Sequence, residues 1–118
     1  MIKTTTIVGI SGSLRKASSN TKLLKYTEKK LKMINTEVAF SLGSIDLPLY
    51  NDDLEKEKGV PKSVIELGDL LGSASGIIIS TPEYNKGISG ALKNCFDWMS
   101  RLKPNPLTSK TIAILSAT

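Results

Sequence analysis

The sequence predicts an α/β protein in which helices cover both faces of a parallel sheet. Two observations predict this class. Short β-branched or apolar runs alternate with amphipathic segments along the 118 residues, which is typical of parallel strands joined by crossover helices. Three of the four runs are also apolar nearly throughout, as in strands that are buried on both faces. We find no repeat or low-complexity tract, so a single domain over residues 1–118 is expected.

The strand pattern recurs in four short segments. They are residues 4–10, 37–42, 76–80 and 111–116. Their length and their β-branched content favour strands over buried helices. Because crossovers between parallel strands are right-handed, few topologies can join them.

The helical pattern recurs in three segments. They are residues 20–34, 62–71 and 89–102. The expected apolar face of the first contains Leu23, Leu24, Thr27, Leu31 and Ile34, and that of the second contains Val64, Ile65 and Leu71. The third has a wide apolar stripe of Leu92, Cys95, Phe96 and Met99, extended by Ala91, Trp98 and Leu102, which predicts a helix covered on more than one side. Asp97 and Arg101 are expected to pair on it. Residues 43–58 are polar and are predicted to form a long loop.

The composition excludes several kinds of chemistry. The chain has no His and one Cys, Cys95, so these residues cannot build a Ser-His-Asp triad, a Cys-His pair or a common structural zinc site. No metal site is expected, and an enzyme of this composition would use carboxylates or a cofactor. A lone cysteine fits a reducing compartment. No apolar run is long enough to span a membrane and none resembles a signal peptide, so a cytoplasmic location is expected.

The loop after the first strand is suited to an anion. Residues 11–20 are rich in hydroxyl groups, include Arg15 and lead into a helix. Free N–H groups at a helix N-terminus attract negative charge, and an arginine can bind phosphate through two hydrogen bonds. Neither a Gly-x-Gly-x-x-Gly nor a Walker A pattern is present, so a single terminal phosphate is indicated. A plain helix N-cap is the alternative interpretation.

The loop after the third strand is suited to a flat ligand. Residues 81–90 contain Pro82, Tyr84, Asn85 and two glycines, which provide an aromatic face, an amide and room for close backbone approach. An ordinary strand-to-helix turn is the alternative. Ligands of open α/β sheets bind beyond the carboxyl ends of the strands. A ligand with a planar head and one phosphate would use both loops, and flavin mononucleotide (FMN) is such a ligand.

Two motifs resemble those of a known family. The first is Gly12-Ser13-Leu14-Arg15-Lys16-x-Ser18-x-Asn20, and the second is Thr81-Pro82-Glu83-Tyr84-Asn85 followed by Gly90-x-Leu92-Lys93-Asn94-x-x-Asp97-Trp98-x-Ser100-Arg101. Both are similar to signatures of the NADPH-dependent FMN reductase family, which includes chromate, quinone and azo-dye reductases. The likeness extends over nearly the whole chain.

The resemblance implies a flavodoxin-like fold, a bound FMN and a defined set of cofactor-binding residues. The phosphate and ribityl chain would lie against Ser13, Arg15, Ser18, Ser19 and Asn20. The ring would lie against Pro82, Glu83, Tyr84 and Asn85, and the last contact would be Thr118. It further implies hydride transfer from NADPH or NADH to the flavin, with no catalytic side chain, and electron delivery to a quinone, free flavin, azo dye or metal oxyanion.

Family members form dimers or tetramers, so the resemblance also implies a homodimer or homotetramer. The helix that carries Cys95, Phe96, Trp98, Met99 and Arg101 is expected to contribute to the interface. Family members continue past the position of Thr118 with a fifth strand and a last helix. The chain is therefore expected to contain strands in the order 2-1-3-4, as a C-terminally truncated form.

Two alternatives remain at this point. One is a truncated form that binds FMN weakly or not at all and persists as an oligomer. The other is a nucleic-acid-binding module, suggested by the net charge of +5 and by Lys22, Lys25, Lys29 and Lys32 on one helix face. Such a stripe is usually a solvated face, so neither nucleic-acid nor membrane partners are expected.

Overall fold

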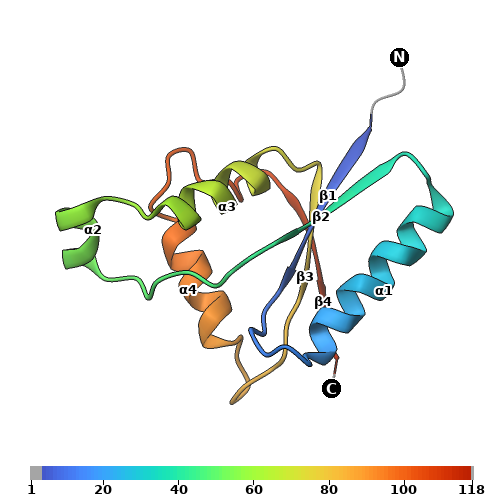
Figure 1. The fold of residues 1–118 in the computed structure, drawn as a ribbon, viewed down its shortest axis with the longest axis horizontal. Helices are drawn as coiled ribbons and strands as arrows, with labels where there is room; N and C mark the ends of the chain where they lie inside the picture. Colours follow the sequence, from blue (N-terminus) through green and yellow to red (C-terminus); the bar gives the residue numbers. More distant parts are fainter. Residues whose placement is uncertain (1–3, 118) are drawn as a thin grey trace.

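The four strands form one parallel sheet in the order β2-β1-β3-β4 (Figure 1). The computed structural model describes residues 4–117. The strands are β1 (Thr5–Ser11), β2 (Val38–Gly43), β3 (Gly76–Ser80) and β4 (Thr111–Leu115). Their order is the one predicted from the sequence, and the chain has a flavodoxin-like α/β fold.

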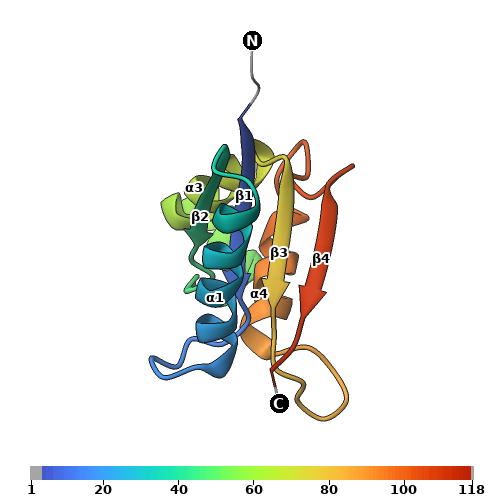
Figure 2. The ribbon, with the colours of Figure 1, turned by 90° about the vertical axis from the view of Figure 1, so that its right-hand side faces the viewer.

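Helices cover the two faces of the sheet unequally. The helices are α1 (Ser19–Ile34), α2 (Asp52–Lys58), α3 (Lys62–Gly72) and α4 (Gly90–Met99). Figure 1 shows α1 on one face, with α3 and α4 on the other, and α2 projecting beyond them. Figure 2 shows α1 in front of the sheet and β4 at its edge, beside β3. Among residues 4–117, no helix has both the length and the apolar character needed to cross a bilayer.

The main core lies between the sheet and the pair α3 and α4. Successive residues of a strand point to opposite faces, so Val8 and Ile10 of β1 point to the same face as their β3 partners Ile77 and Ile79. These four side chains are at most 2% exposed and belong to one buried cluster with residues of α3 and α4. The predicted buried strands are therefore confirmed for β1 and β3. β4 is more exposed than expected, with Ile114 at 69%.

A short helix lies within the segment predicted to be a loop. The Asn51 side chain caps α2 by accepting hydrogen bonds from the N–H groups of Asp53 and Leu54. Acidic residues occupy the first turn of α2 and lysines its last turn, which complements the helix dipole. No residue of α2 is buried. Because capping and charge, rather than apolar periodicity, stabilise this helix, the periodicity could not reveal it.

Helix α4 ends three residues earlier than predicted. The N–H groups of Arg101 and Leu102 donate to the carbonyls of Trp98 and Met99, so the chain tightens after the last helical turn. Pro104 follows and cannot continue a helix. Leu102 still packs against the core from outside the helix.

Three further details differ from the predictions. Ile34 and Ile65 are exposed. In α1 the buried apolar residue is Leu24, and in α3 the buried face is formed by Val64, Leu67 and Leu71. Asp97 pairs with Lys93 instead of Arg101. Arg101 pairs with Glu55 of α2, across 2.8 Å, because α2 projects alongside α4.

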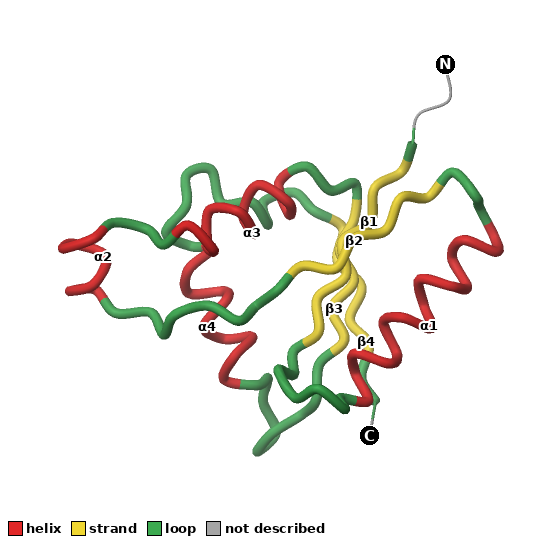
Figure 3. The backbone as a smooth tube through the Cα atoms, in the orientation of Figure 1, coloured by secondary structure: helices red, strands yellow, loops and turns green. Residues whose placement is uncertain are grey.

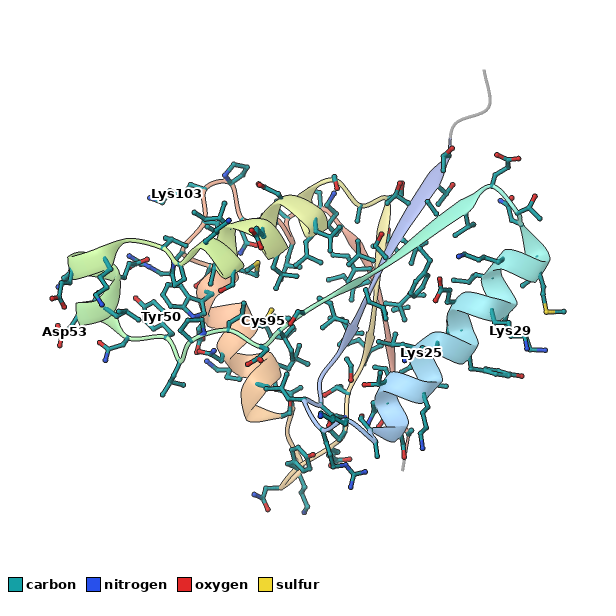
Figure 4. All side chains as sticks on the ribbon, in the orientation of Figure 1. Lys25, Lys29, Tyr50, Asp53, Cys95 and Lys103 are labelled. Atoms are coloured by element: carbon teal, nitrogen blue, oxygen red, sulfur yellow. The ribbon has the colours of Figure 1, made fainter. Side chains whose placement is uncertain are left out.

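The segment that carries α2 is attached to α4 by buried polar contacts. The Pro48 carbonyl accepts hydrogen bonds from Trp98 Nε1 (2.7 Å) and Asn94 Nδ2 (3.0 Å). The Tyr50 ring packs edge-on against the Trp98 ring, with centroids 4.9 Å apart. Figure 4 labels Tyr50 near α2 and Cys95 on α4. Cys95, Trp98 and Met99 are thus buried within the chain, so of the five residues expected at a subunit interface only Phe96 and Arg101 retain exposed surface.

Candidate cofactor site

The two loops singled out in the sequence leave the sheet side by side. Ser11 and Ser80, the last residues of β1 and β3, are register partners. The chain then continues into residues 12–18, called the phosphate loop below, and into residues 81–89, called the second loop. Figure 3 shows these loops together at the end of the sheet where the chain also ends. The topology therefore brings together residues that are far apart in the sequence.

A cavity of about 270 Å³ opens between these loops. Its lining contains seven of the ten predicted cofactor residues together with Ala117: Ser13, Arg15, Ser18, Ser19, Asn20, Pro82, Tyr84 and Ala117. Glu83 and Asn85 do not line it, and both are exposed in the second loop. Thr118 lies outside the described residues. No carboxylate is among the lining residues, so the lining favours an anion.

The N-terminus of α1 points at this cavity. Ser18 caps the helix, since its side chain accepts hydrogen bonds from the N–H groups of Asn20 (3.2 Å) and Thr21 (3.3 Å). Among the described residues, no acceptor bonds the Ser19 N–H. The first turn of α1 also contains no acidic residue, in contrast to α2. The positive end of the helix dipole thus remains available to an anion.

Asn20 places a further donor at the cavity. Its side chain is 3% exposed, and Oδ1 accepts hydrogen bonds from Ser80 Oγ (2.9 Å) and the Ala117 N–H (3.1 Å). A backbone N–H can only donate, so the atom that faces Ala117 is the amide oxygen. Asn20 lines the cavity, so Nδ2 is the donor that its side chain can offer there.

Arg15 completes the set of donors. Within residues 4–117, the only hydrogen bond of its side chain is a long one, 3.4 Å, which the guanidinium donates to the Ala17 carbonyl. It forms no ion pair within residues 4–117. With the hydroxyls of Ser13, Ser18 and Ser19, it surrounds the free helix N-terminus with groups that can donate hydrogen bonds. This donor set fits a phosphate monoester.

The second loop forms a tight turn beside the cavity. Tyr84 and Gly87 exchange two backbone hydrogen bonds of 2.9 and 2.8 Å. The residues between them, Asn85 and Lys86, have φ of 50° and 63°, which asparagine tolerates better than most residues. Tyr84, which is 54% exposed, lines the cavity together with Pro82. An aromatic and a proline side chain provide a surface against which a planar ring can pack.

Two residues that were not expected at the site, Ser80 and Ser89, form hydrogen bonds with Gly12 of the first motif and join the two loops. The Gly12 N–H donates to the Ser80 carbonyl across 2.7 Å, and Ser89 Oγ donates to the Gly12 carbonyl across 2.6 Å. A Cβ on Gly12 would collide with the Thr81 side chain, so only glycine allows this approach. The available signals were that Ser80 ends a run of isoleucines and that Ser89 precedes a helix. Neither signal identified a partner.

Three other features do not match this chemistry. A larger cavity of about 510 Å³ lies at the opposite end of the sheet, where α3 meets residues 102–106, and its walls include Ile65, Leu102 and Pro106. Burial raises the pKa of the Cys95 thiol to about 11, so this cysteine stays protonated at neutral pH and is a poor nucleophile. The lysines of α1 are exposed, and Figure 4 shows Lys29 on the side away from the sheet.

Comparison with known proteins identifies the family. The chain is an α/β protein with a cavity lined by hydrogen-bond donors at the carboxyl ends of its central strands. The model of the family described as NADPH-dependent FMN reductase matches residues 5–118, and the chain belongs to this family. A quinone reductase of Escherichia coli strain K12 is 40% identical over 108 residues, which cover 92% of this chain and 57% of that protein.

Further relatives agree in sequence and structure. An NAD(P)H-dependent FMN reductase of Pseudomonas aeruginosa is 36% identical over 112 residues, covering 94% of this chain and 58% of the relative. The solved structure of FerB from Paracoccus denitrificans, described as a flavoenzyme NAD(P)H:(acceptor) oxidoreductase, superposes with a TM-score of 0.82 at 36% identity. It covers 97% of this chain and 61% of that one. The chain thus spans less than two thirds of the length of these relatives.

Proposed function

We propose that residues 1–118 form a single FMN-binding domain of an NAD(P)H-dependent oxidoreductase. The observation that carries this proposal is the cavity between the phosphate loop and the second loop. At one side it offers the free N-terminus of α1, Arg15 and Asn20 Nδ2 to an anion. At the other side it offers Pro82 and Tyr84 to a planar ring. Membership of the family supports FMN as the ligand that combines both parts.

In this proposal the chain binds and orients the cofactor. Ser13, Arg15, Ser18, Ser19 and Asn20 hold the phosphate and the ribityl chain, and Pro82, Glu83, Tyr84, Asn85 and Thr118 flank the ring. Glu83 and Asn85 would act through the backbone of the turn, since their side chains do not line the cavity. Bound FMN supplies hydride acceptance from NADPH or NADH and electron delivery to an acceptor. No side chain of this chain is assigned a proton-transfer step, in keeping with its lack of His.

The proposed acceptors are small molecules. A quinone is favoured by the names of the Escherichia coli and plant relatives, and free flavin by the name of the Pseudomonas aeruginosa relative. Azo dyes and metal oxyanions complete the proposed class. A homodimer or homotetramer is part of the same proposal, and the exposed Ile112 and Ile114 of β4 (38% and 69%) favour association. We place the protein in the cytoplasm, since a lone buried thiol suits a reducing compartment.

The experiment compares FMN with riboflavin, which lacks the phosphate. Purified protein is titrated with each ligand, and flavin fluorescence reports binding. We expect FMN to bind at least about tenfold more tightly than riboflavin, since charge-assisted hydrogen bonds to phosphate are strong. Arg15→Ala should remove most of this difference, while Lys29→Ala, on the exposed side of α1, should leave it unchanged. Equal affinity for the two flavins would contradict the proposed site.

Activity and mass are measured on the same preparation. The loaded protein should oxidise NADPH or NADH when a quinone is supplied. The second candidate function is a form that binds FMN weakly and persists as an oligomer, which the exposed β4 side chains favour. Failure to bind FMN, together with a high mass by light scattering, would favour this candidate over the oxidoreductase.

A further inference from the structure

We propose that Ser89 is a positioning residue that sets the affinity of the site for the cofactor phosphate, although its side chain does not line the cavity. The inference rests on the proposed function, because it takes FMN as the ligand. Ser89 acts through the Gly12 carbonyl, to which its hydroxyl donates. It thereby holds the phosphate loop in the arrangement that an anion requires.

Ser89 is built into the fold at the start of α4. Its side chain is 3% exposed. Oγ accepts a hydrogen bond from the Leu92 N–H (3.1 Å), which caps α4, and donates to the Gly12 carbonyl (2.6 Å), 77 positions earlier in the chain. One hydroxyl thus uses its lone pair within its own helix and its proton on the phosphate loop. The cap fixes where the hydroxyl stands, so the bond to Gly12 starts from a rigid element.

The hydrogen bond from Ser89 to the Gly12 carbonyl determines the orientation of the Gly12–Ser13 peptide. A trans peptide is planar, so its C=O and N–H point in opposite directions. The Gly12 carbonyl points to Ser89, and the N–H of the same peptide, on Ser13, points to Ser11 Oγ at 3.3 Å. Ser11 Oγ in turn accepts from Thr21 Oγ1 in the first turn of α1 (2.9 Å). The start of the phosphate loop is therefore held between α4 on one side and α1 on the other.

Loss of the Ser89 hydroxyl would leave this peptide under-constrained. Gly12 is a glycine, whose backbone can rotate more freely than that of any other residue. A rotated Gly12 peptide would turn its carbonyl oxygen toward α1, where the phosphate is proposed to bind, and would displace Ser13 and Arg15. Two bonds would remain: that from the Gly12 N–H to Ser80, which holds only the other side of Gly12, and the longer one from the Ser13 N–H to Ser11 Oγ (3.3 Å). Ser89 thus makes the shorter of the two side-chain bonds to the Gly12–Ser13 peptide, 2.6 Å against 3.3 Å, and does so from outside the cavity.

The test separates positioning from capping. Ser89→Ala removes both hydrogen bonds, and Ser89→Thr keeps a hydroxyl in the same place. Asn51→Ala is the matched control, because it removes an equivalent cap from α2 with no contact to the loops. Affinities for FMN and riboflavin are measured by fluorescence, and amide hydrogen exchange of residues 11–18 is measured without ligand. Ser89→Gly serves as a second variant, since glycine is a tolerated N-cap without a hydroxyl.

We expect Ser89→Ala to weaken FMN binding about tenfold, the effect of losing roughly one hydrogen bond, and to change riboflavin binding less than twofold. Exchange of residues 11–18 should speed up in Ser89→Ala and Ser89→Gly. Ser89→Thr should restore both properties, and Asn51→Ala should change neither. Equal weakening of FMN and riboflavin, or unchanged exchange in residues 11–18, would overturn the proposal. If the wild-type protein binds no FMN, the proposed function fails, and the exchange data alone decide whether Ser89 holds the loop.

Discussion

The two faces of the sheet bury different kinds of side chain. Toward α3 and α4, the central strands present Val8, Ile10, Ile77 and Ile79, which pack into a dry cluster. Toward α1, the same strands end in Ser11 and Ser80, which form hydrogen bonds with Thr21 and Asn20 of that helix, respectively. One face is therefore built mainly for stability, while the other combines apolar residues such as Leu24 with a polar network. Because the faces are separate, stability and cofactor affinity should respond to different substitutions.

The largest effect on stability is expected from Trp98→Ala on the α3 and α4 face. Trp98 is fully buried and its indole donates to the Pro48 carbonyl. A cavity of this size and the loss of that bond should lower the free energy of unfolding by about 4–5 kcal/mol. Urea denaturation measures the change, with Trp98→Phe as a milder control. FMN affinity of the folded variant should stay within twofold, and a large loss of affinity would show that the faces are not independent.

Leu24→Ala tests the α1 face. Leu24 is fully buried, one turn after Asn20 on the same side of the helix. We expect about 3 kcal/mol of lost stability, and here FMN affinity should fall as well, because α1 carries Ser18, Ser19 and Asn20. Lys25→Ala, at the exposed neighbouring position, should stay within about 0.5 kcal/mol. If Leu24→Ala left FMN affinity unchanged, the packing of α1 on the sheet would not affect the site.

Cys95 makes the stability of the dry face sensitive to alkaline pH. Burial raises its pKa in the folded chain from 9.0 to about 11. Below the unfolded-state pKa the thiol is neutral in both states, and its contribution to stability is fully present. This contribution is lost as the pH rises from 9 to 11, because the unfolded thiol ionises first. Stability should therefore fall over this range by about 2 kcal/mol more in wild type than in Cys95→Ala. Parallel pH profiles of the two proteins would contradict this expectation.

The smallest effect is expected at the rim of the dry face. Lys110 Nζ donates to the carbonyls of Gly72 and Ala74, each at 2.7 Å, at the C-terminal end of α3. Lys110→Met removes a cation from a helix C-terminus and should cost about 1 kcal/mol of stability. The exposed Lys103 offers a comparison, since Lys103→Met should change stability by less than about 0.5 kcal/mol. Thermal denaturation at low and high salt distinguishes the two.

The sequence predicted the sheet because buried parallel strands leave a direct apolar signal. It also singled out most of the residues that line the cavity, since Ser13, Arg15 and Asn20 share one loop and helix start whose composition is unusual. It missed α2, which is stabilised by the Asn51 cap and by charge. It placed Glu83 and Asn85 with the ring-facing residues, although neither lines the cavity. The left-handed turn at Asn85 and Lys86 is a property of the backbone, and the residue types alone did not reveal it. The Ser89–Gly12 bond was not visible, since nothing local to either residue names its partner.

The bonds between the loops also order events during folding. Each side-chain bond that closes the cavity joins residues 60 or more positions apart: Asn20 with Ser80, Asn20 with Ala117, and Gly12 with Ser89. Contacts of such high sequence separation form late, because the entropy of closing a long loop must be overcome first. A nascent chain can complete β1 and α1 early, yet the phosphate loop acquires its final shape only after α4 has been synthesised and docked. Cofactor loading therefore belongs to the last stage of folding.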